Sequence, residues 1–132
     1  MASPADRMKP RITLRLDLGT GQSIGPGKIR LLEALDESGS ISSAGRDLGM
    51  SYRRAWMLVE QMNQTFRRKV VTTQLGGTSG GGARLTPFGR EVLKRYRAIE
   101  SKAESGAKAH LAALARAAQP ATPSAKRRRL SR

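Results

Sequence analysis

Residues 39–64, GSISSAGRDLGMSYRRAWMLVEQMNQ, contain two helical segments with a glycine between them. The serines of residues 40–43 (SISS) can accept the first free amides of a short helix, which Gly49 would end and which would bury Ile41, Ala44 and Leu48. A second helix is expected from Tyr52 to about residue 67, because its apolar side chains share a narrow face at about 100° per residue. These side chains are Ala55, Val59, Met62 and Phe66. Trp56, beside this face, is expected to pack rather than to stack on a ligand.

A β-hairpin and a long helix are expected next. Residues 70–75 (VVTTQL) are mostly β-branched, and residues 83–85 (ARL) can return along them across the loop at residues 76–82 (GGTSGGG). Residues 86–87 (TP) supply an N-cap and a first-turn proline for the helix. This helix has an Ala-rich far end interrupted by Gly106, and one apolar side formed by Phe88, Val92, Tyr96, Ile99 and Ala103.

Two further elements precede the helical pair. Residues 12–18 (ITLRLDL) alternate apolar and polar side chains, which is the period of a half-buried strand, and the run GTGQ at residues 19–22 ends it. Pro26 then opens a helix that Gly39 would stop. The apolar residues of this helix recur at helical spacing: Ile29, Leu32 and Leu35.

The order is therefore strand, helix, short helix, tight turn, long helix, β-hairpin and helix. These are the ingredients of a winged helix-turn-helix, a mainly α fold with a small β wing, here with a long C-terminal helix. Shifts in composition divide the chain into a flexible N-terminal tail (1–10), the winged helix-turn-helix domain (11–105), an Ala-rich helical extension (106–118) and a disordered basic tail (119–132).

The chain is strongly cationic. Its 25 Lys and Arg residues against 10 Asp and Glu give a formal net charge of +15 and a pI of about 11.6. The excess extends through the central region as well as the tail, whose KRRR run at residues 126–129 is typical of solvated tails and also raises affinity for polyanions. Nucleic acid is the expected class of partner, ahead of an anionic membrane.

Catalytic and metal-binding functions have little support. The chain contains no cysteine, which excludes disulfides, thiolate metal sites and cysteine nucleophiles. The single histidine, His110, has no carboxylates clustered around it, and we find no paired-carboxylate spacing or nucleotide-binding signature. We expect no catalytic residue, cofactor or metal. Because no apolar stretch approaches the roughly 20 residues that span a bilayer, and the N-terminus lacks a signal core, we expect a cytoplasmic protein located at the nucleoid.

The second helix of the pair has a polar outward face suited to reading a duplex, since a helix fits the major groove when that face is polar and its first turn is free. Arg53 and Arg54 can bond guanine in a bidentate manner and Gln61 can bond adenine. Ser51 and Tyr52 are better placed for phosphate. The alternative is a solvated helix face that contacts nothing, but the position of the two arginines directly after the turn favours a DNA-binding role.

The loop at residues 76–82 has three interpretations. Glycines let amides approach phosphate, as in nucleoside-triphosphate loops, but no Gly-Lys-Ser/Thr follows and Ala83 stands where lysine is required. A wing tip along the DNA backbone or minor groove, with Arg84 beside it, fits better than a merely flexible tip. The candidate DNA-binding residues are Ser40, Ser42, Ser51, Tyr52, Arg53, Arg54, Met57, Gln61, Thr78, Ser79, Gly80 and Arg84.

From about residue 12 to residue 104, the chain resembles the N-terminal DNA-binding domain of the ModE family of molybdate-responsive regulators, which is itself similar to LysR-type winged helices. The resemblance is carried by residues 39–64 and by residues 76–96, GGTSGGGARLTPFGREVLKRY. Its most distinctive parts are the entry at Gly39-Ser40-Ile41-Ser42, the block of Ser51-Tyr52, Ala55-Trp56 and Met62-Asn63, and the glycine-rich wing followed by Leu85-Thr86 and Gly89.

The resemblance implies a transcriptional regulator that binds double-stranded DNA as a dimer, with the helix from Tyr52 in the major groove and the wing alongside. It also implies a homodimer built through the first helix (about 26–38) and the long last helix (about 87–117). Family members carry an oxyanion-binding domain after this one. The residues beyond position 105 are too few and too rich in Ala and Arg to form it, so molybdate sensing is not expected here.

Two other functions use the same charge. A nonspecific nucleic-acid-binding protein, either nucleoid-associated or RNA-binding, would coat polyanions, but the chain lacks the interleaved aromatic residues of a stacking platform. Binding to a membrane surface through the C-terminal region would insert little beyond Leu111 and Leu114, so no membrane partner is expected.

Overall fold

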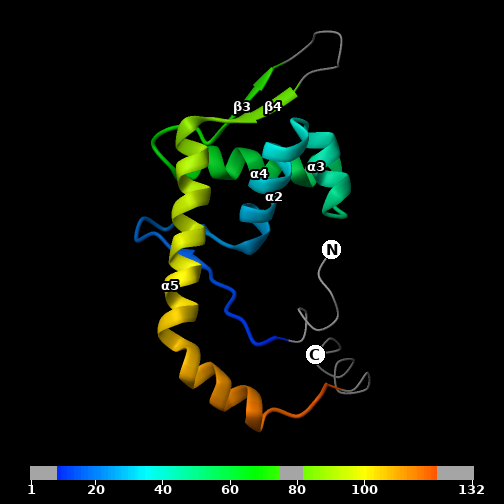
Figure 1. Ribbon diagram of the computed structural model, residues 1–132. Helices are drawn as coiled ribbons and strands as arrows, with labels where there is room; N and C mark the ends of the chain where they lie inside the picture. Colours follow the sequence, from blue (N-terminus) through cyan, green and yellow to red (C-terminus); the bar gives the residue numbers. More distant parts are fainter. Residues whose placement is uncertain (1–8, 75–81, 122–132) are drawn as a thin grey trace. The chain divides into compact units, whose positions relative to one another are not determined.

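The computed structural model describes residues 9–74 and 82–121 of the chain (Figure 1). The described residues fall into two compact units. Residues Thr13–Lys102 form one unit, and the described residues before and after that range form the other. The described secondary structure is mainly helical, with two small antiparallel sheets. This confirms the predicted fold class, a winged helix-turn-helix with a long C-terminal helix.

Helix α2 (Pro26–Ser38) begins and ends where the sequence predicts. Pro26 occupies the first turn, and the C-cap Gly39 has a φ of 72°, a left-handed conformation that glycine adopts without a steric penalty. The Gly39 amide donates to the Leu35 carbonyl at 2.8 Å. The buried face is broader than predicted and comprises Ile29, Leu31, Leu32, Ala34 and Leu35.

Helices α3 (Ile41–Asp47) and α4 (Tyr52–Thr65) form the predicted pair joined by a tight turn. Gly49 has a φ of 68°, so the chain reverses there in a conformation that other residues rarely adopt. Within α3, a Cβ on Gly45 would lie 3.3 Å from the Met50 carbonyl oxygen and 3.5 Å from the Ala55 Cβ. Glycine at position 45 therefore allows the two helices to pack closely across the turn.

Two helix ends differ from the predictions. Leu48 is the C-cap of α3 and is only partly buried, whereas the sequence predicted a core residue. Helix α4 ends at Thr65, two residues early, because Phe66 takes an extended conformation and packs edge-on against Phe88 at a centroid distance of 5.4 Å. Arg68 stacks over the same Phe88 ring at 4.2 Å.

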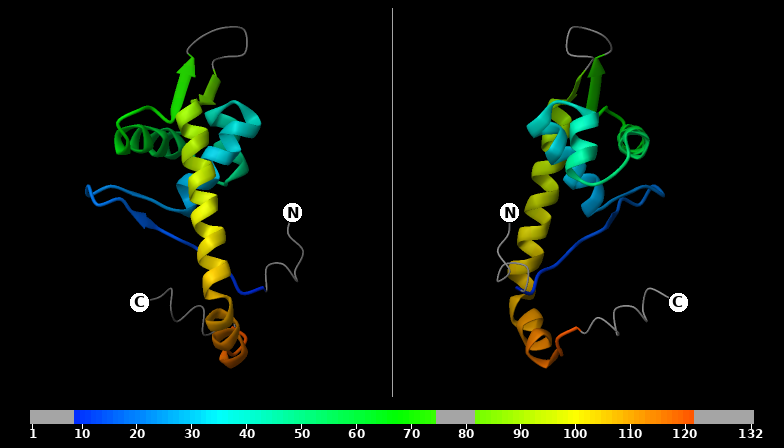
Figure 2. Two further views of the ribbon diagram at one scale, coloured as in Figure 1. Left: turned by 60° about the vertical axis from the view of Figure 1, so that its left-hand side comes forward. Right: turned by 90° about the vertical axis from the view of Figure 1, so that its right-hand side faces the viewer.

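The predicted hairpin is confirmed as β3 (Val71–Gln74) and β4 (Gly82–Leu85), which pair antiparallel. The Ala83 amide donates to the Gly39 carbonyl at 2.9 Å, which joins β4 to the end of α2. The views of Figure 2 show the hairpin extending from the end of the unit where α5 begins.

Helix α5 (Pro87–Ala117) starts at the predicted cap. The Thr86 hydroxyl accepts the Gly89 amide at 2.9 Å and donates to the Lys69 carbonyl at 2.7 Å. The helix runs through Gly106 to Ala117, in agreement with the expected range of about 87–117, because the surrounding Ala-rich sequence favours helix strongly enough to outweigh a single glycine, which costs about 1 kcal/mol.

The first predicted strand is shorter than expected. Only Leu16–Asp17 form strand β1, which pairs with an unpredicted β2 (Ser23–Ile24). The alternation of burial nevertheless holds from Ile12 to Leu16, whereas Leu18 is 37% exposed. The Tyr96 hydroxyl donates to the Leu14 carbonyl, and this bond ties the extended segment before β1 to α5.

Candidate nucleic-acid interface

The start of α4 is an exposed helix N-terminus with its cap in place. The Ser51 hydroxyl accepts the Arg54 amide at 3.1 Å, which satisfies one of the free amides of the first turn. Ser51, Tyr52, Arg53 and Arg54 are all exposed, as predicted. The partial positive charge of a helix N-terminus therefore faces solvent together with two arginines.

These two arginines carry charges that no described carboxylate neutralises. Other arginines do form ion pairs within the described residues: Arg15 with Asp17, Arg90 with Asp36, Arg95 with Glu91, and Arg97 with Glu33 and Glu100. The start of α4 is therefore a positively charged surface, whereas several other basic positions of the unit are locally balanced.

Arg53, Met57 and Gln61 follow one another at intervals of four residues, so they lie along one side of α4. All three are exposed, and Met57 has 53% of its surface accessible. The buried side of the same helix is formed by Ala55, Val59 and Met62. The structure thus places these three predicted candidates on one exposed strip, with Tyr52 and Arg54 on either side of its start.

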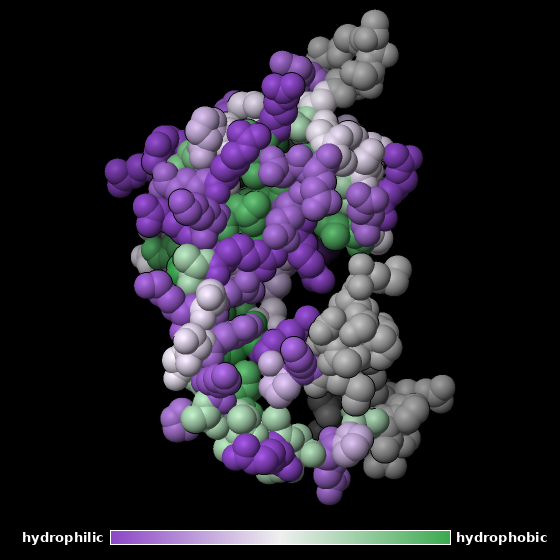
Figure 3. All heavy atoms as spheres, viewed as in Figure 1, coloured by the Kyte–Doolittle hydropathy of each residue, from purple (hydrophilic) through white to green (hydrophobic). Residues whose placement is uncertain are grey.

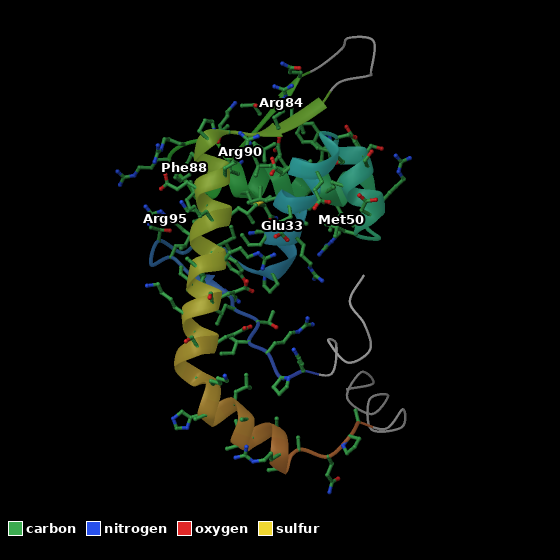
Figure 4. The ribbon with its side chains drawn as sticks, viewed as in Figure 1. Glu33, Met50, Arg84, Phe88, Arg90 and Arg95 are labelled. Carbon is green, nitrogen blue, oxygen red and sulfur yellow. The ribbon has the colours of Figure 1, made fainter. Side chains whose placement is uncertain are left out.

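The hairpin contributes one described candidate. Arg84 is exposed on β4, directly opposite Thr72 of β3 (Figure 4). Thr78, Ser79 and Gly80 lie outside the described residues, and the predicted placement of these three stays a prediction. Arg84 forms no ion pair with a carboxylate that the structure describes.

The two serine candidates at the start of α3, Ser40 and Ser42, differ in their surroundings. The Ser40 side chain caps α3 by accepting the Ser43 amide at 3.1 Å, and it is partly buried. Ser42 is exposed on the first turn of α3. Ser40 thus has a structural role in the helix, while Ser42 is accessible to a ligand.

A cleft of about 350 Å³ between α4 and β3 was missed by the sequence analysis. Asn63 holds its two walls together: its Oδ1 accepts the amides of Val70 (2.8 Å) and Val71 (3.1 Å), and its Nδ2 donates to the Val71 carbonyl (3.0 Å). The lining includes Trp56, Glu60, Gln64, Lys69, Thr72 and Thr73. Glu60 and Gln64 lie on the exposed face of α4, which helical periodicity locates, whereas the lining residues on the strand side depend on a register that only the fold defines.

Trp56 and Tyr52 form a pair that spacing alone did not identify. The indole Nε1 of Trp56 donates to the Tyr52 hydroxyl oxygen at 2.6 Å, one helical turn apart. Trp56 packs against the core as predicted, while Tyr52 is 56% exposed.

Ion pairs and a buried tyrosine hold α5 in place within the unit. The Arg97 guanidinium donates two hydrogen bonds to Glu33 of α2, at 2.5 and 3.1 Å, and one to Glu100, at 2.6 Å. Glu33 is labelled in Figure 4. The hydrogen bonds to Glu33 are the main reason that the pKa of Arg97 is raised. Burial raises the pKa of the Tyr96 hydroxyl, and the nearby Glu100 carboxylate raises it further.

The surface in Figure 3 is predominantly hydrophilic on the face shown, with apolar atoms visible in gaps between polar side chains. Among residues 9–74 and 82–121, no cluster of three or more His, Cys, Asp or Glu side chains is arranged to hold a metal ion. Within the same ranges, no helix has both the length and the apolar character needed to span a membrane.

Comparison with known proteins relates this arrangement to a bacterial family. Residues 27–90 match the family model described as "Bacterial regulatory helix-turn-helix protein, lysR family". The chain is 45% identical to the molybdenum-pterin-binding protein MopB of Rhodobacter capsulatus over 82 residues, which are 62% of this chain and 30% of MopB.

Two further relatives have regulatory or transport names. The molybdenum transport protein ModE of Azotobacter vinelandii is 38% identical over 76% of this chain and 37% of its own length. The DNA-binding transcriptional dual regulator ModE of Escherichia coli (strain K12) is 38% identical over 67% of this chain and 34% of its own. The chain thus spans about a third of the length of these relatives. Residues 27–90 thus form a LysR-type helix-turn-helix domain, and the chain is similar to the part of the ModE and MopB proteins that it spans.

Proposed function

We propose that the chain is a transcriptional regulator that binds double-stranded DNA with selectivity for sequence. The observation that carries this proposal is the pair of exposed arginines, Arg53 and Arg54, on the capped first turn of α4, with no described carboxylate to neutralise them. A relative covering this region bears the name of a DNA-binding transcriptional regulator, which supports the same function.

In this proposal α4 enters the major groove. Arg53 and Arg54 donate to guanine, Gln61 bonds adenine, and Met57 makes an apolar contact with base edges. Ser42, Ser51 and Tyr52 contact phosphates, with Ser40 supporting the first turn of α3. The hairpin lies along the backbone or the minor groove through Arg84, and we expect Thr78, Ser79 and Gly80 to contribute from the tip.

We further propose that the chain acts in the cytoplasm, on chromosomal DNA, as a homodimer built through α2 (Pro26–Ser38) and α5 (Pro87–Ala117). Two-fold symmetric proteins place two recognition helices on half-sites about one helical turn apart. Selection of tight-binding duplexes from a random pool tests both points together. A palindromic consensus supports the proposal, whereas a pool that remains random after selection contradicts it.

Arginine substitutions test the division of roles. We expect Arg53→Ala to relax base preference at one position by about 1–3 kcal/mol, and Arg84→Ala to weaken all duplexes alike. Arg15→Ala is the matched control, since it removes the same charge from an exposed arginine that pairs with Asp17 on another element. Equal losses on selected and scrambled duplexes for both test variants would contradict the assignment.

A second candidate is nonspecific nucleic-acid binding, which the net charge of +15 favours. It predicts that random duplex competes as effectively as the selected sequence, and that RNA competes as well as DNA. Competition titrations at one salt concentration separate the two functions.

A further inference from the structure

The start of α4 carries a hydrogen-bonded aromatic pair in which Trp56 packs against the core and Tyr52 is exposed. We propose that Trp56 is a positioning residue: by donating to the Tyr52 hydroxyl oxygen, it directs the hydroxyl proton toward a DNA phosphate. This inference rests on the proposed function, because it concerns how the same helix contacts the duplex.

The two side chains differ in how firmly they are held. Trp56 is half-buried and packs against the core cluster, so its ring and the direction of its N–H are fixed by the fold. Tyr52 is 56% exposed and sits on the first turn. The 2.6 Å bond between Trp56 Nε1 and the Tyr52 hydroxyl oxygen therefore connects a rigid donor to an accessible group.

The hydrogen bond from Trp56 determines that the exposed Tyr52 hydroxyl acts as a donor toward other groups. An indole N–H can only donate, so the Tyr52 oxygen acts as the acceptor in this bond. The hydroxyl proton is left to donate outward. Accepting one hydrogen bond also polarises the hydroxyl and strengthens it as a donor. The pair thus favours a partner that is purely an acceptor.

Phosphate oxygens are acceptors of this kind, and the surroundings favour them. The free amides at the start of α4 and the charges of Arg53 and Arg54 create a positive potential beside Tyr52. Half or more of the hydrogen bonds between proteins and DNA go to phosphate and sugar. Because Trp56 fixes the hydroxyl beforehand, less conformational freedom is lost when the phosphate binds.

The sole tryptophan of the chain allows a clean test. Biosynthetic replacement of tryptophan by β-(3-benzothienyl)alanine changes only position 56, keeps the shape of the bicyclic ring and exchanges the N–H for sulfur. Affinity for the selected duplex is measured for the wild type, the analogue protein, Tyr52→Phe and the combination. Thermal unfolding of all four proteins checks that folding is retained.

We expect Tyr52→Phe to weaken DNA binding about tenfold, as for a lost hydrogen bond to a charged group. The analogue should weaken binding about threefold when Tyr52 is present and not at all in the Tyr52→Phe background. Neither change removes a charge, so the dependence of affinity on salt should keep its slope. Single methylphosphonate substitutions along the duplex should reveal one position where the wild type loses affinity and Tyr52→Phe does not.

Equal weakening by the analogue in both backgrounds would overturn the positioning role and leave Trp56 as packing alone. A Tyr52→Phe protein that responds to every methylphosphonate as the wild type does would overturn the phosphate contact in favour of a base edge. If these tests fail while Arg53→Ala still relaxes base preference, only this inference is lost. If the wild type shows no preference among duplexes, the proposed function itself fails.

Discussion

At the scale of single residues, the closest packing in the unit depends on the absence of a side chain. Gly89 lies in the first turn of α5 against the segment that enters β3. A Cβ at Gly89 would lie 2.1 Å from the Val70 carbonyl oxygen and 3.0 Å from its carbonyl carbon. The Val70 carbonyl also accepts the Thr86 amide at 3.0 Å, so it cannot move away without breaking a backbone hydrogen bond.

We therefore predict that Gly89→Ala destabilises the fold by about 3 kcal/mol, the cost of forcing an extra methyl into a packed backbone. Gly106→Ala is the matched control in the same helix, because its Cβ would meet nothing within 4 Å. That substitution should raise helix stability by about 1 kcal/mol through propensity alone. Denaturant unfolding followed by circular dichroism measures both. Effects of the same sign for the two variants would contradict this explanation.

The buried Tyr96 hydroxyl predicts a loss of stability in alkali. Its pKa is raised above the ordinary value of 10.0, first by burial and then by Glu100. As pH rises above about 10, the unfolded chain loses the tyrosine proton before the folded chain does, so the free energy of unfolding falls. Tyr96→Phe should flatten this decline and lower stability at neutral pH, because the bond to the Leu14 carbonyl is lost. The urea midpoints of the wild type and of Tyr96→Phe, measured across the alkaline range, test this prediction. A midpoint that falls with pH equally in both proteins would contradict it.

At the scale of elements, the predictions succeeded where the deciding signals are local. The cap at Ser40 and the turn glycines Gly39 and Gly49 each act within a few residues, so the helix-turn-helix was predictable from the sequence. The cap at Ser51 is equally local but was not among the predictions. The short β2 strand was not, because its two residues carry no periodic pattern and depend on pairing with β1. The same applies to the role of Gly89, which depends on a contact with a distant segment.

The candidate site likewise has one part that local sequence signals predict and one part that depends on tertiary contacts. The exposed strip on α4 follows from helical periodicity, so Arg53, Met57 and Gln61 could be located in advance. The cleft beside it could not be located, because it requires the tertiary placement of β3 against α4. Asn63 makes that placement, yet in the sequence it is one polar residue on the border of an apolar face.

Asn63→Ala should therefore lower both stability and DNA affinity. The substitution leaves the amides of Val70 and Val71 without their partner, and both residues are buried, which predicts a loss of about 2–3 kcal/mol. DNA affinity should fall as well, since the hairpin loses its attachment to α4. Gln64→Ala, on the exposed side of the same helix, is the control and should leave the free energy of unfolding almost unchanged. An Asn63→Ala protein as stable as Gln64→Ala would refute the bridging role.

At the scale of the whole molecule, some basic residues are neutralised by a neighbouring carboxylate and others are not. Several arginines of the described residues are paired with carboxylates, and these pairs lie at the start of β1, on α5 and between α5 and α2. Arg53, Arg54 and Arg84 are exposed on the helix and hairpin and have no such pairing to a described carboxylate. The net charge of +15 attracts any polyanion from a distance. These three arginines belong to a larger set of exposed cations without a described carboxylate partner, which includes Arg30, Arg46, Arg67 and Arg68.

This distribution leads to a prediction about salt. If about six phosphates are neutralised in the complex, affinity should fall on the order of 10³-fold between 50 and 200 mM salt, because each contact releases condensed counterions. The basic residues at positions 126–129 would add to that slope on any duplex without adding preference. Truncation after Ala118 should therefore reduce the slope and weaken scrambled duplex more than selected duplex. Arg84→Ala should lower the slope by about 1 on both. Fluorescence anisotropy at four salt concentrations measures the slopes, and an affinity that barely responds to salt would contradict a phosphate-based interface.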